Sequence, residues 1–294
     1  MFFFYFIIYL LIWLISIQPF FLLYIFSDLM YYLLYYVIQY RKKTVMQNIK
    51  HTLPLLTKEK QLTIQKNYYR HLCDMFFEII KALTLSEKEK IKRCSFTNIE
   101  VYEEFQKKEK SIIIMGAHYA GYECATMLKN HSASELYFIT KKFKNYYANR
   151  LICAIRKRYK IIPLETKKVI SVISDNSTAK KKATYVFICD QSPKLSPSNY
   201  YTSFMGIETP FHIGPEKLSK RYNMNILFLK TNKVKRGHYE VSFEVITTNA
   251  QKTKEGEITQ QYIKLVEEQI HKAPEYYLWS HKRWKHSKQT PCTK

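Results

Sequence analysis

The first 27 residues carry no charged side chain. Positions 2–26 are apolar or aromatic except at Ser16, Gln18 and Pro19. A run of this length is sufficient to cross the hydrocarbon core of a bilayer. No basic residue precedes it and no small-residue cleavage site comes after it, so we expect residues 1–27 to form a retained membrane anchor. Pro19 is expected to kink or divide the helix, which leaves open an anchor that is only partly embedded.

A second charge-free stretch, residues 29–40, is rich in Tyr and ends at Arg41-Lys42-Lys43. Tyr suits the headgroup boundary, whereas an ordinary buried helix would give the same pattern, so both interpretations stay open. The basic cluster favours the cytoplasmic side for the remainder of the chain, because positive residues flank membrane segments on that side. We therefore expect residues 28–294 to form one domain on the cytoplasmic face.

Between residues 57 and 90 the apolar positions recur at helical spacing, without Gly or Pro. Thr57 and Ser86 are placed to cap helix starts, the latter as a capping box with Glu89. From about residue 110 the pattern changes to short β-branched runs separated by helical segments. The predicted strands are 111–115, 136–140, 161–163, 185–189 and 226–231, and the predicted helices are 123–130, 145–159, 169–180 and 215–222.

This alternation predicts an α/β fold, an αβα sandwich with a mostly parallel sheet. Residues 239–246 alternate like an antiparallel edge strand, and residues 258–271 read as a final helix. The ligand crevice of an open α/β sheet lies at the carboxyl ends of its strands. This rule points to His118 after the first predicted strand, to Lys141-Lys142 after the second, and to Asp190 and Gln191 after the strand at 185–189.

His118 and Glu123 lie five residues apart, which on one continuous helix would place them on different faces. If His118 lies in a loop and Glu123 in the first helical turn, Gly116 and Gly121 give the backbone the freedom to bring the side chains together. A carboxylate on one imidazole nitrogen would leave the other nitrogen free to act as a general base.

The net charge of +23, from 47 basic and 24 acidic residues, indicates an anionic partner. No nucleic-acid-binding motif accompanies the charge. The six cysteines show no metal-ligand spacing, so we expect neither a metal nor another cofactor, and we expect reduced thiols.

Two alternatives to a His-Glu enzyme are compatible with the sequence. One is a cysteine nucleophile, for which Cys124 and Cys189 are the candidates because they adjoin Glu123 and Asp190. The other is a basic membrane-binding module without catalysis.

The segment GAHYAGYE, with His118 and Glu123, resembles the His-x4-Asp/Glu motif of the bacterial lipid A biosynthesis acyltransferases, the late lauroyl/myristoyl acyltransferases, in the form HYGNWE. Gly121-Tyr122 departs from the usual Asn-Trp, which puts the shape of the acyl pocket in question. Further segments resemble family blocks in the family's order: 40–42, 47–49, 69–71, Glu78, 190–193, 204–210, 214–217, 237–239 and 278–285. The likeness extends over nearly the whole chain.

The resemblance implies a glycerophosphate-acyltransferase-like fold at the inner membrane. It also implies transfer of a fatty acyl chain from acyl carrier protein to a hydroxyl of a lipid A precursor. His118 would be the base and Glu123 its orienting carboxylate, and Arg156 would polarise the carbonyl or hold phosphate. Asp190 and Gln191 would shape the pocket. Another glycolipid or an amino-acid-containing lipid is the alternative acceptor. The basic and indole-rich tail at 279–285 suits a headgroup boundary or a phosphorylated saccharide, or else a packing segment.

Overall fold

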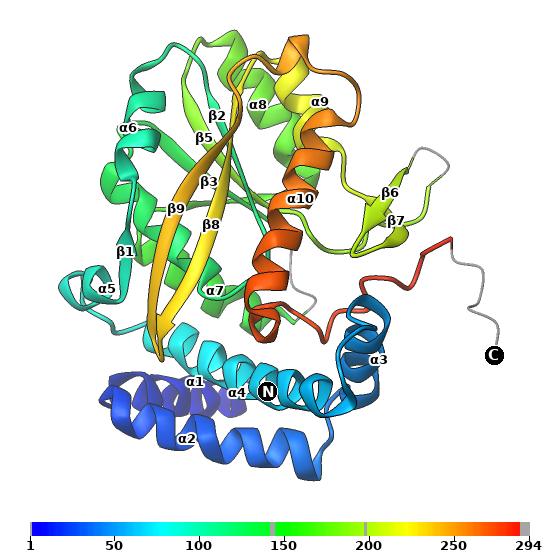
Figure 1. Ribbon diagram of the computed structural model, residues 1–294. Coiled ribbons are helices and arrows are strands. Elements are labelled where there is room, and N and C mark those ends of the chain that lie inside the picture. Colours follow the sequence, from blue (N-terminus) through cyan, green and yellow to red (C-terminus); the bar gives the residue numbers. More distant parts are fainter. Residues whose placement is uncertain (1, 142–144, 197–198, 289–294) are drawn as a thin grey trace.

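The computed structural model describes residues 2–141, 145–196 and 199–288. Its centre is a sheet of seven described strands in the order β1-β9-β8-β2-β5-β3-β4 (Figure 1). Every neighbouring pair is parallel except β8 and β9. The bounds are β1 Cys94–Phe96, β2 Ile112–Gly116, β3 Glu135–Thr140, β4 Ile162–Glu165, β5 Ala183–Ile188, β8 Asn225–Lys235 and β9 His238–Thr247. The predicted α/β fold with a mostly parallel sheet is confirmed.

Helices cover both faces of the sheet. Neighbouring residues of a strand point to opposite faces. In β5, Thr184 shares a 3.1 Å hydrogen bond with Tyr102 of α6, while the Tyr185 hydroxyl accepts one from Asn176 of α8. Helices α6 and α8 therefore lie on opposite faces. The helical elements of this domain are α5 Glu87–Arg93, α6 Ile99–Lys107, η2 Tyr122–His131, α7 Tyr146–Arg158, η3 Thr166–Lys168, α8 Val169–Thr178, α9 Gly214–Arg221, η4 Ala250–Lys252, α10 Glu257–Lys272 and η5 Pro274–Tyr276.

Two features of the sheet differ from the sequence prediction. Strand β9 is antiparallel to β8 as expected, but it is not at the edge, because the three-residue strand β1 pairs with it on the other side. The structure also adds a separate hairpin, β6 Tyr200–Phe204 and β7 Ile207–Phe211, which the sequence pattern does not predict. Met205 and Gly206 join its strands, both with positive φ, as a two-residue hairpin turn requires.

The N-terminal helices form a layer against the end of this domain (Figure 1). They are α1 Phe2–Ile17, α2 Phe20–Tyr32, the π-helical turn η1 Leu33–Val37, α3 Lys42–Thr52 and α4 Lys58–Lys81. Pro19 divides the apolar run, as expected, and the side chains of Thr57 and Ser86 cap α4 and α5. Lys81 of α4 donates hydrogen bonds to the carbonyls of Ser16 and Gln18, which ties the α1–α2 junction to α4.

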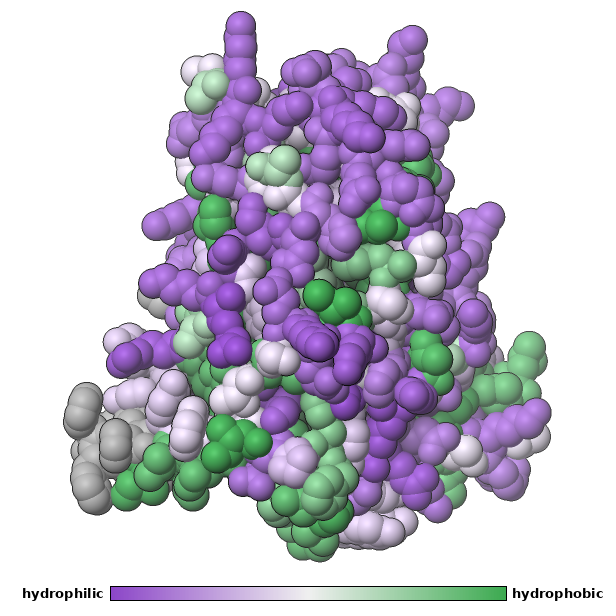
Figure 2. All heavy atoms as spheres, turned by 90° about the vertical axis from the view of Figure 1, so that its left-hand side faces the viewer, coloured by the Kyte–Doolittle hydropathy of each residue, from purple (hydrophilic) through white to green (hydrophobic). Residues whose placement is uncertain are grey.

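The outer face of this layer is apolar. Figure 2 shows hydrophobic residues gathered at the end of the molecule where α1 and α2 lie, with polar residues over most of the remaining surface. Exposed members include Leu10, Leu14, Phe21, Ile25 and Leu29. Residues Phe20–Val37 are long and apolar enough to cross a membrane. The predicted boundary at residue 27 falls inside α2, where Ser27 donates a 2.7 Å hydrogen bond to Asp74 of α4.

Candidate active site

His118 and Asp190 meet at the carboxyl ends of two adjacent strands. The register pairs Gly116 of β2 with Ile188 of β5, so the residues two positions further on lie side by side. Asp190 Oδ1 accepts hydrogen bonds from the His118 backbone N–H at 3.1 Å and from His118 Nδ1 at 2.7 Å. The Asp190 side chain is 2% exposed and that of His118 is 21% exposed. The imidazole is thus held on one edge and reachable on the other.

The electrostatics of this pair favour a charged imidazole. Burial alone would lower the pKa of His118, but the charge and hydrogen bond of Asp190 outweigh burial and raise the pKa above its ordinary value. Burial would raise the pKa of Asp190, yet its interactions with His118 keep that pKa below the usual range. Asp190 therefore stabilises the imidazolium that would form when His118 accepts a proton.

Gln191 contacts the other imidazole nitrogen. Its Nε2 lies 3.3 Å from His118 Nε2. Since His118 Nδ1–H donates to Asp190, His118 Nε2 is the unprotonated nitrogen of the neutral ring and accepts from the Gln191 amide. Asp190 and Gln191 together select the tautomer that a general base needs.

The structure gives His118 a different carboxylate partner from the one its sequence spacing indicated. Glu123 does lie in the first turn of a helix, η2, but its Oε1 is 3.5 Å from Nη2 of Arg156 in α7. The His-Glu hydrogen bond is replaced by His118–Asp190, because parallel strand ends bring those two residues together directly. Glu123 acts on His118 only through its charge, which adds to the raised pKa.

The Arg156 side chain is mostly buried beside this cluster, and part of its hydrogen-bonding capacity is unused. Its side chain is 11% exposed, and its Nε and Nη1 atoms are buried without a partner among the described residues. A buried guanidinium with free donors is suited to an oxygen that carries negative charge. The structure thus brings four of the predicted residues together with His118: Glu123, Arg156, Asp190 and Gln191. Lys142 lies outside the described residues.

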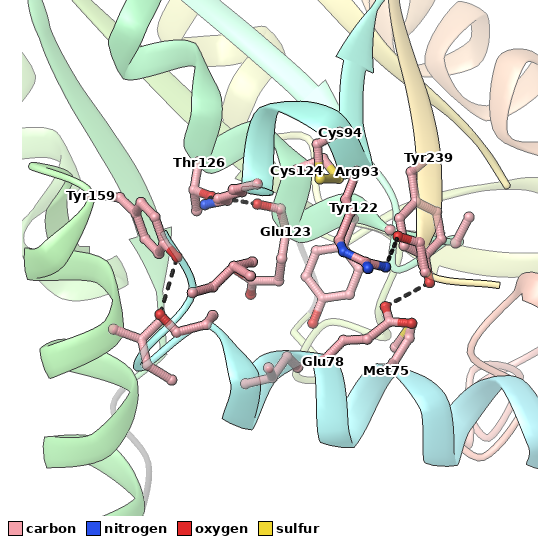
Figure 3. A pocket seen from close by; sticks show the side chains of 18 of the residues that line it. Met75, Glu78, Arg93, Cys94, Tyr122, Glu123, Cys124, Thr126, Tyr159 and Tyr239 are labelled. Carbon is pink, nitrogen blue, oxygen red and sulfur yellow. Dashed lines mark hydrogen bonds between the residues drawn. A yellow bond between two sulfur atoms is a disulfide. The ribbon is translucent and has the colours of Figure 1, made fainter. Parts of the chain in front are cut away.

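An apolar cavity lies next to the site, on the other side of Tyr122 (Figure 3). The Tyr122 ring lines this cavity and its centroid is 5.1 Å from that of the His118 ring, whereas His118, Asp190 and Gln191 are not among the lining residues. The cavity has a volume of about 100 Å³, and its open side widens to the solvent. Glu123 and Arg156 contribute to its wall, and most of the remaining lining is apolar. This lining comes from α2, α4, α7 and the residues just after α4 and α7, and includes Phe20, Met75, Ile79, Ala82, Leu85, Ile152, Ile155 and Tyr159. A cavity of this kind is suited to a hydrocarbon chain.

The structure explains why glycine stands at position 121, where the sequence departs from the family motif. A Cβ at Gly121 would lie 2.4 Å from the ring of Tyr239, so only glycine fits. Tyr239 also lines the cavity and donates a 2.8 Å hydrogen bond to Glu78, whose pKa burial raises to about 7. Tyr239 therefore occupies space that a larger residue at position 121 would take.

The expectation of reduced cysteines is wrong for one pair. Cys94 and Cys124 form a disulfide, while Cys73, Cys153 and Cys189 are free and Cys292 lies outside the described residues. Cys124 therefore has no thiol to act as a nucleophile. Burial raises the pKa of Cys189 to about 12, which keeps that thiol protonated. Neither candidate of the cysteine hypothesis is suited to attack.

Sequence reasoning missed His281, which supports the loop that carries Asp190. Its Nε2 accepts a 3.1 Å hydrogen bond from the Ser192 backbone N–H. The mixture of indole and cationic side chains at 279–285 was the one sequence feature that pointed to this segment. It does not indicate that His281 would bind the loop at Ser192.

An acid–histidine pair at the strand ends of an α/β sheet is suited to general-base catalysis, and an apolar cavity next to it is suited to a hydrocarbon chain. A family model described as "Bacterial lipid A biosynthesis acyltransferase" matches residues 1–286, and the chain belongs to this family. A search of curated proteins found no match. Among solved structures, the chain is similar to the 1-acyl-sn-glycerophosphate acyltransferase PlsC from Thermotoga maritima, at 11% identity and a TM-score of 0.39, over 84% of this chain and 95% of that chain.

Proposed function

We propose that the protein transfers a fatty acyl chain from acyl carrier protein to a hydroxyl of a lipid A precursor. The observation that carries this proposal is the His118–Asp190 pair, which is next to an apolar cavity through Tyr122. The Tyr122 ring contacts the His118 ring and lines the cavity, and Arg156 and Glu123 line it too. The acyl chain would occupy the cavity, and its thioester carbonyl would lie near Arg156 and His118.

The chemistry derives from the geometry of His118. Its Nε2 accepts the proton of the acceptor hydroxyl, and the hydroxyl oxygen attacks the thioester carbonyl carbon. Free donors of Arg156 stabilise the negative charge on the carbonyl oxygen. When the carbon–sulfur bond breaks, the departing thiolate takes the proton from the His118 imidazolium. Atoms and protons balance without an acyl-enzyme.

Glu123 retains a supporting part in this proposal. Its contact with Arg156 holds the guanidinium at the cavity wall, and its charge favours the imidazolium form of His118. The orienting role inferred from the family motif passes to Asp190.

A second cavity supports an acceptor that carries phosphate. It is a groove between α3 and the C-terminal segment, and none of the described residues that line it is acidic. Its cationic or titratable lining residues are Lys50, His51, Lys282 and Lys285. Phosphate groups on a saccharide headgroup would neutralise them. The anionic acyl carrier protein would find favourable charge over the wider surface, since the net charge is +23.

The acceptor is tested by the lipid A of cells that lack this protein. Mass spectrometry should show lipid A with one acyl chain fewer, and the wild-type gene should restore that chain. The matched complement carries His118→Ala and should not restore it. Unchanged lipid A in the deletion strain would contradict this acceptor and favour another glycolipid or an amino-acid-containing lipid.

A further inference from the structure

The residues after η5 form a fixed part of the domain instead of a solvated tail. Trp279 and Arg283 are fully buried. Asn48 of α3 donates hydrogen bonds to the carbonyls of Trp279, at 2.8 Å, and His281, at 2.9 Å. The Arg283 guanidinium donates to Thr209 and Pro210 of β7. The backbone around His281 is therefore held from α3 on one side and from the hairpin β6–β7 on the other.

His281 is the member of this segment that reaches the catalytic loop. Its Nε2 accepts the Ser192 backbone N–H at 3.1 Å. Burial lowers the pKa of His281 to about 4, so the ring is neutral near pH 7 and Nε2 is available as an acceptor. The charged or titratable groups that face the ring are Asp190, Arg283, His118 and Lys285.

Ser192 comes directly after the two residues that bind His118. Asp190 holds His118 Nδ1 and Gln191 contacts its Nε2. These three consecutive residues have no regular secondary structure. Their positions depend on contacts from other elements, and the hydrogen bond to His281 lies next to the pair that orients the imidazole.

We propose that His281 is a positioning residue. It acts through Ser192 to hold Asp190 and Gln191 where their side chains bind His118. This inference rests on the proposed function, in which His118 is the base. It gives His281 a role within the family-like block at 278–285, apart from Lys282 and Lys285, which line the groove proposed for the acceptor's phosphate. His281 lies on the segment that α3 binds, so the loop is connected to the N-terminal helical layer through residues 279–284.

The test compares two substitutions at His281 with a matched control. His281→Leu removes the acceptor for Ser192 N–H, whereas His281→Gln places an amide oxygen near the position of Nε2. His271→Leu is the control, because His271 is exposed on α10, no hydrogen bond described in this structure involves its side chain, and neither it nor its chain neighbours line either cavity. Each full-length variant is measured for kcat, for KM and for the pH dependence of kcat, after circular dichroism shows that it is folded.

The proposal predicts a split between kcat and KM. His281→Leu should lower kcat about 10- to 100-fold, as for a supporting residue whose loss misplaces a base, with KM within about threefold of wild type. The acidic limb of its pH profile should move to lower pH. Without the contact from His281, Asp190 would be held less firmly against His118 and would raise the pKa of His118 by less than in the wild type. His281→Gln should recover most of kcat, and the control should match wild type. A leucine variant with wild-type kcat and pH profile would overturn the proposal, as would equal damage by Gln and Leu.

A direct measurement of the His118 pKa tests this inference independently of the proposed function. The pKa of His118 in the full chain is followed by NMR of 15N-labelled imidazoles, assigned with His118→Ala. A lower pKa in His281→Leu than in wild type, together with no acyl transfer by any variant including wild type, would support the positioning role and contradict the function. An unchanged His118 pKa in His281→Leu would overturn the positioning role, whatever the activity.

Discussion

The orientation of His118 depends on which carboxylate binds its Nδ1. The structure assigns this role to Asp190, and Glu123 acts at longer range. Asp190→Asn should lower kcat by several orders of magnitude, because an amide favours the wrong imidazole tautomer, a change that costs about 10⁴-fold in serine proteases. It should also move the acidic limb of activity to lower pH. Asp190 raises the pKa of His118, so its loss lets the neutral base persist further into acid.

Glu123→Gln is the matched comparison, since it removes one carboxylate charge from the same site. It should weaken activity less and shift the acidic limb less, because Asp190 remains on Nδ1. The measurement is the pH dependence of kcat for the two variants. The larger shift in Glu123→Gln would contradict the assignment and restore the His-Glu pair.

Arg156 offers a second prediction at the scale of one residue. Arg156→Ala should lower kcat about 10²- to 10³-fold, the usual loss for a donor to a developing oxyanion. Lys157 is the next residue in α7 and is exposed, so Lys157→Ala is the control. Single-turnover acyl transfer measures both. Equal rates for the two variants would show that the unpartnered donors of Arg156 do not face the reacting carbonyl.

The candidate residues were predictable from sequence, but their pairing was not. His118, Asp190 and Gln191 come after strands, and strand ends are recognisable as short β-branched runs. The partner of His118 depends on which strands are neighbours in the sheet. β2 lies beside β5 although β3 and β4 come between them in the chain, and a local spacing such as His118 to Glu123 does not contain that information.

At the scale of elements, the disulfide links the start of β1 to η2. Cys124 comes directly after Glu123, so the bond fixes the turn that carries this carboxylate at the cavity wall. After denaturation without reductant, iodoacetamide should label Cys73, Cys153 and Cys189 but not Cys94 or Cys124, as peptide mass spectrometry would show. The double variant Cys94→Ala, Cys124→Ala should lose about 3.6 kcal/mol of stability, the size expected from loop entropy for cysteines 30 positions apart. Labelling of Cys94 and Cys124 in unreduced protein would contradict the bond.

Most elements were predictable because each has a periodic pattern long enough to read. The exceptions have a physical reason. Strand β1 has three residues, too few to show alternation, and it is defined by its pairing with β9. The hairpin β6–β7 depends on a positive φ at Met205. Methionine rarely adopts this conformation, so its presence in the sequence does not predict a turn. The disulfide joins cysteines 30 positions apart, so only the fold shows that they are neighbours.

At the scale of the whole molecule, exposed apolar residues of α1 and α2 gather at one end, where Figure 2 shows a hydrophobic surface. We expect this face to hold the protein on a membrane. Phe21, Ile25 and Leu29 are spaced four residues apart on α2 and are exposed, so they share a stripe of the helix. Changing all three to Glu should move the protein from the membrane fraction to the soluble fraction, because each charge opposes burial in lipid.

Ile170→Glu is the control for this prediction, because Ile170 is an exposed apolar residue on α8, away from the layer. It should leave the membrane fraction unchanged. Membrane fractionation and flotation with anionic lipid vesicles measure both variants. A triple variant that still floats with the vesicles would show that another surface binds the membrane.

The central claim is that His118 catalyses acyl transfer to a lipid A precursor. The most direct measurement is the transfer of a radiolabelled acyl group from acyl carrier protein to a tetra-acylated lipid A precursor in membranes, with wild-type protein and with His118→Ala. We expect transfer by the wild type and its loss in the variant. Equal transfer by both would contradict the role of His118, and no transfer by either would contradict the proposed acceptor.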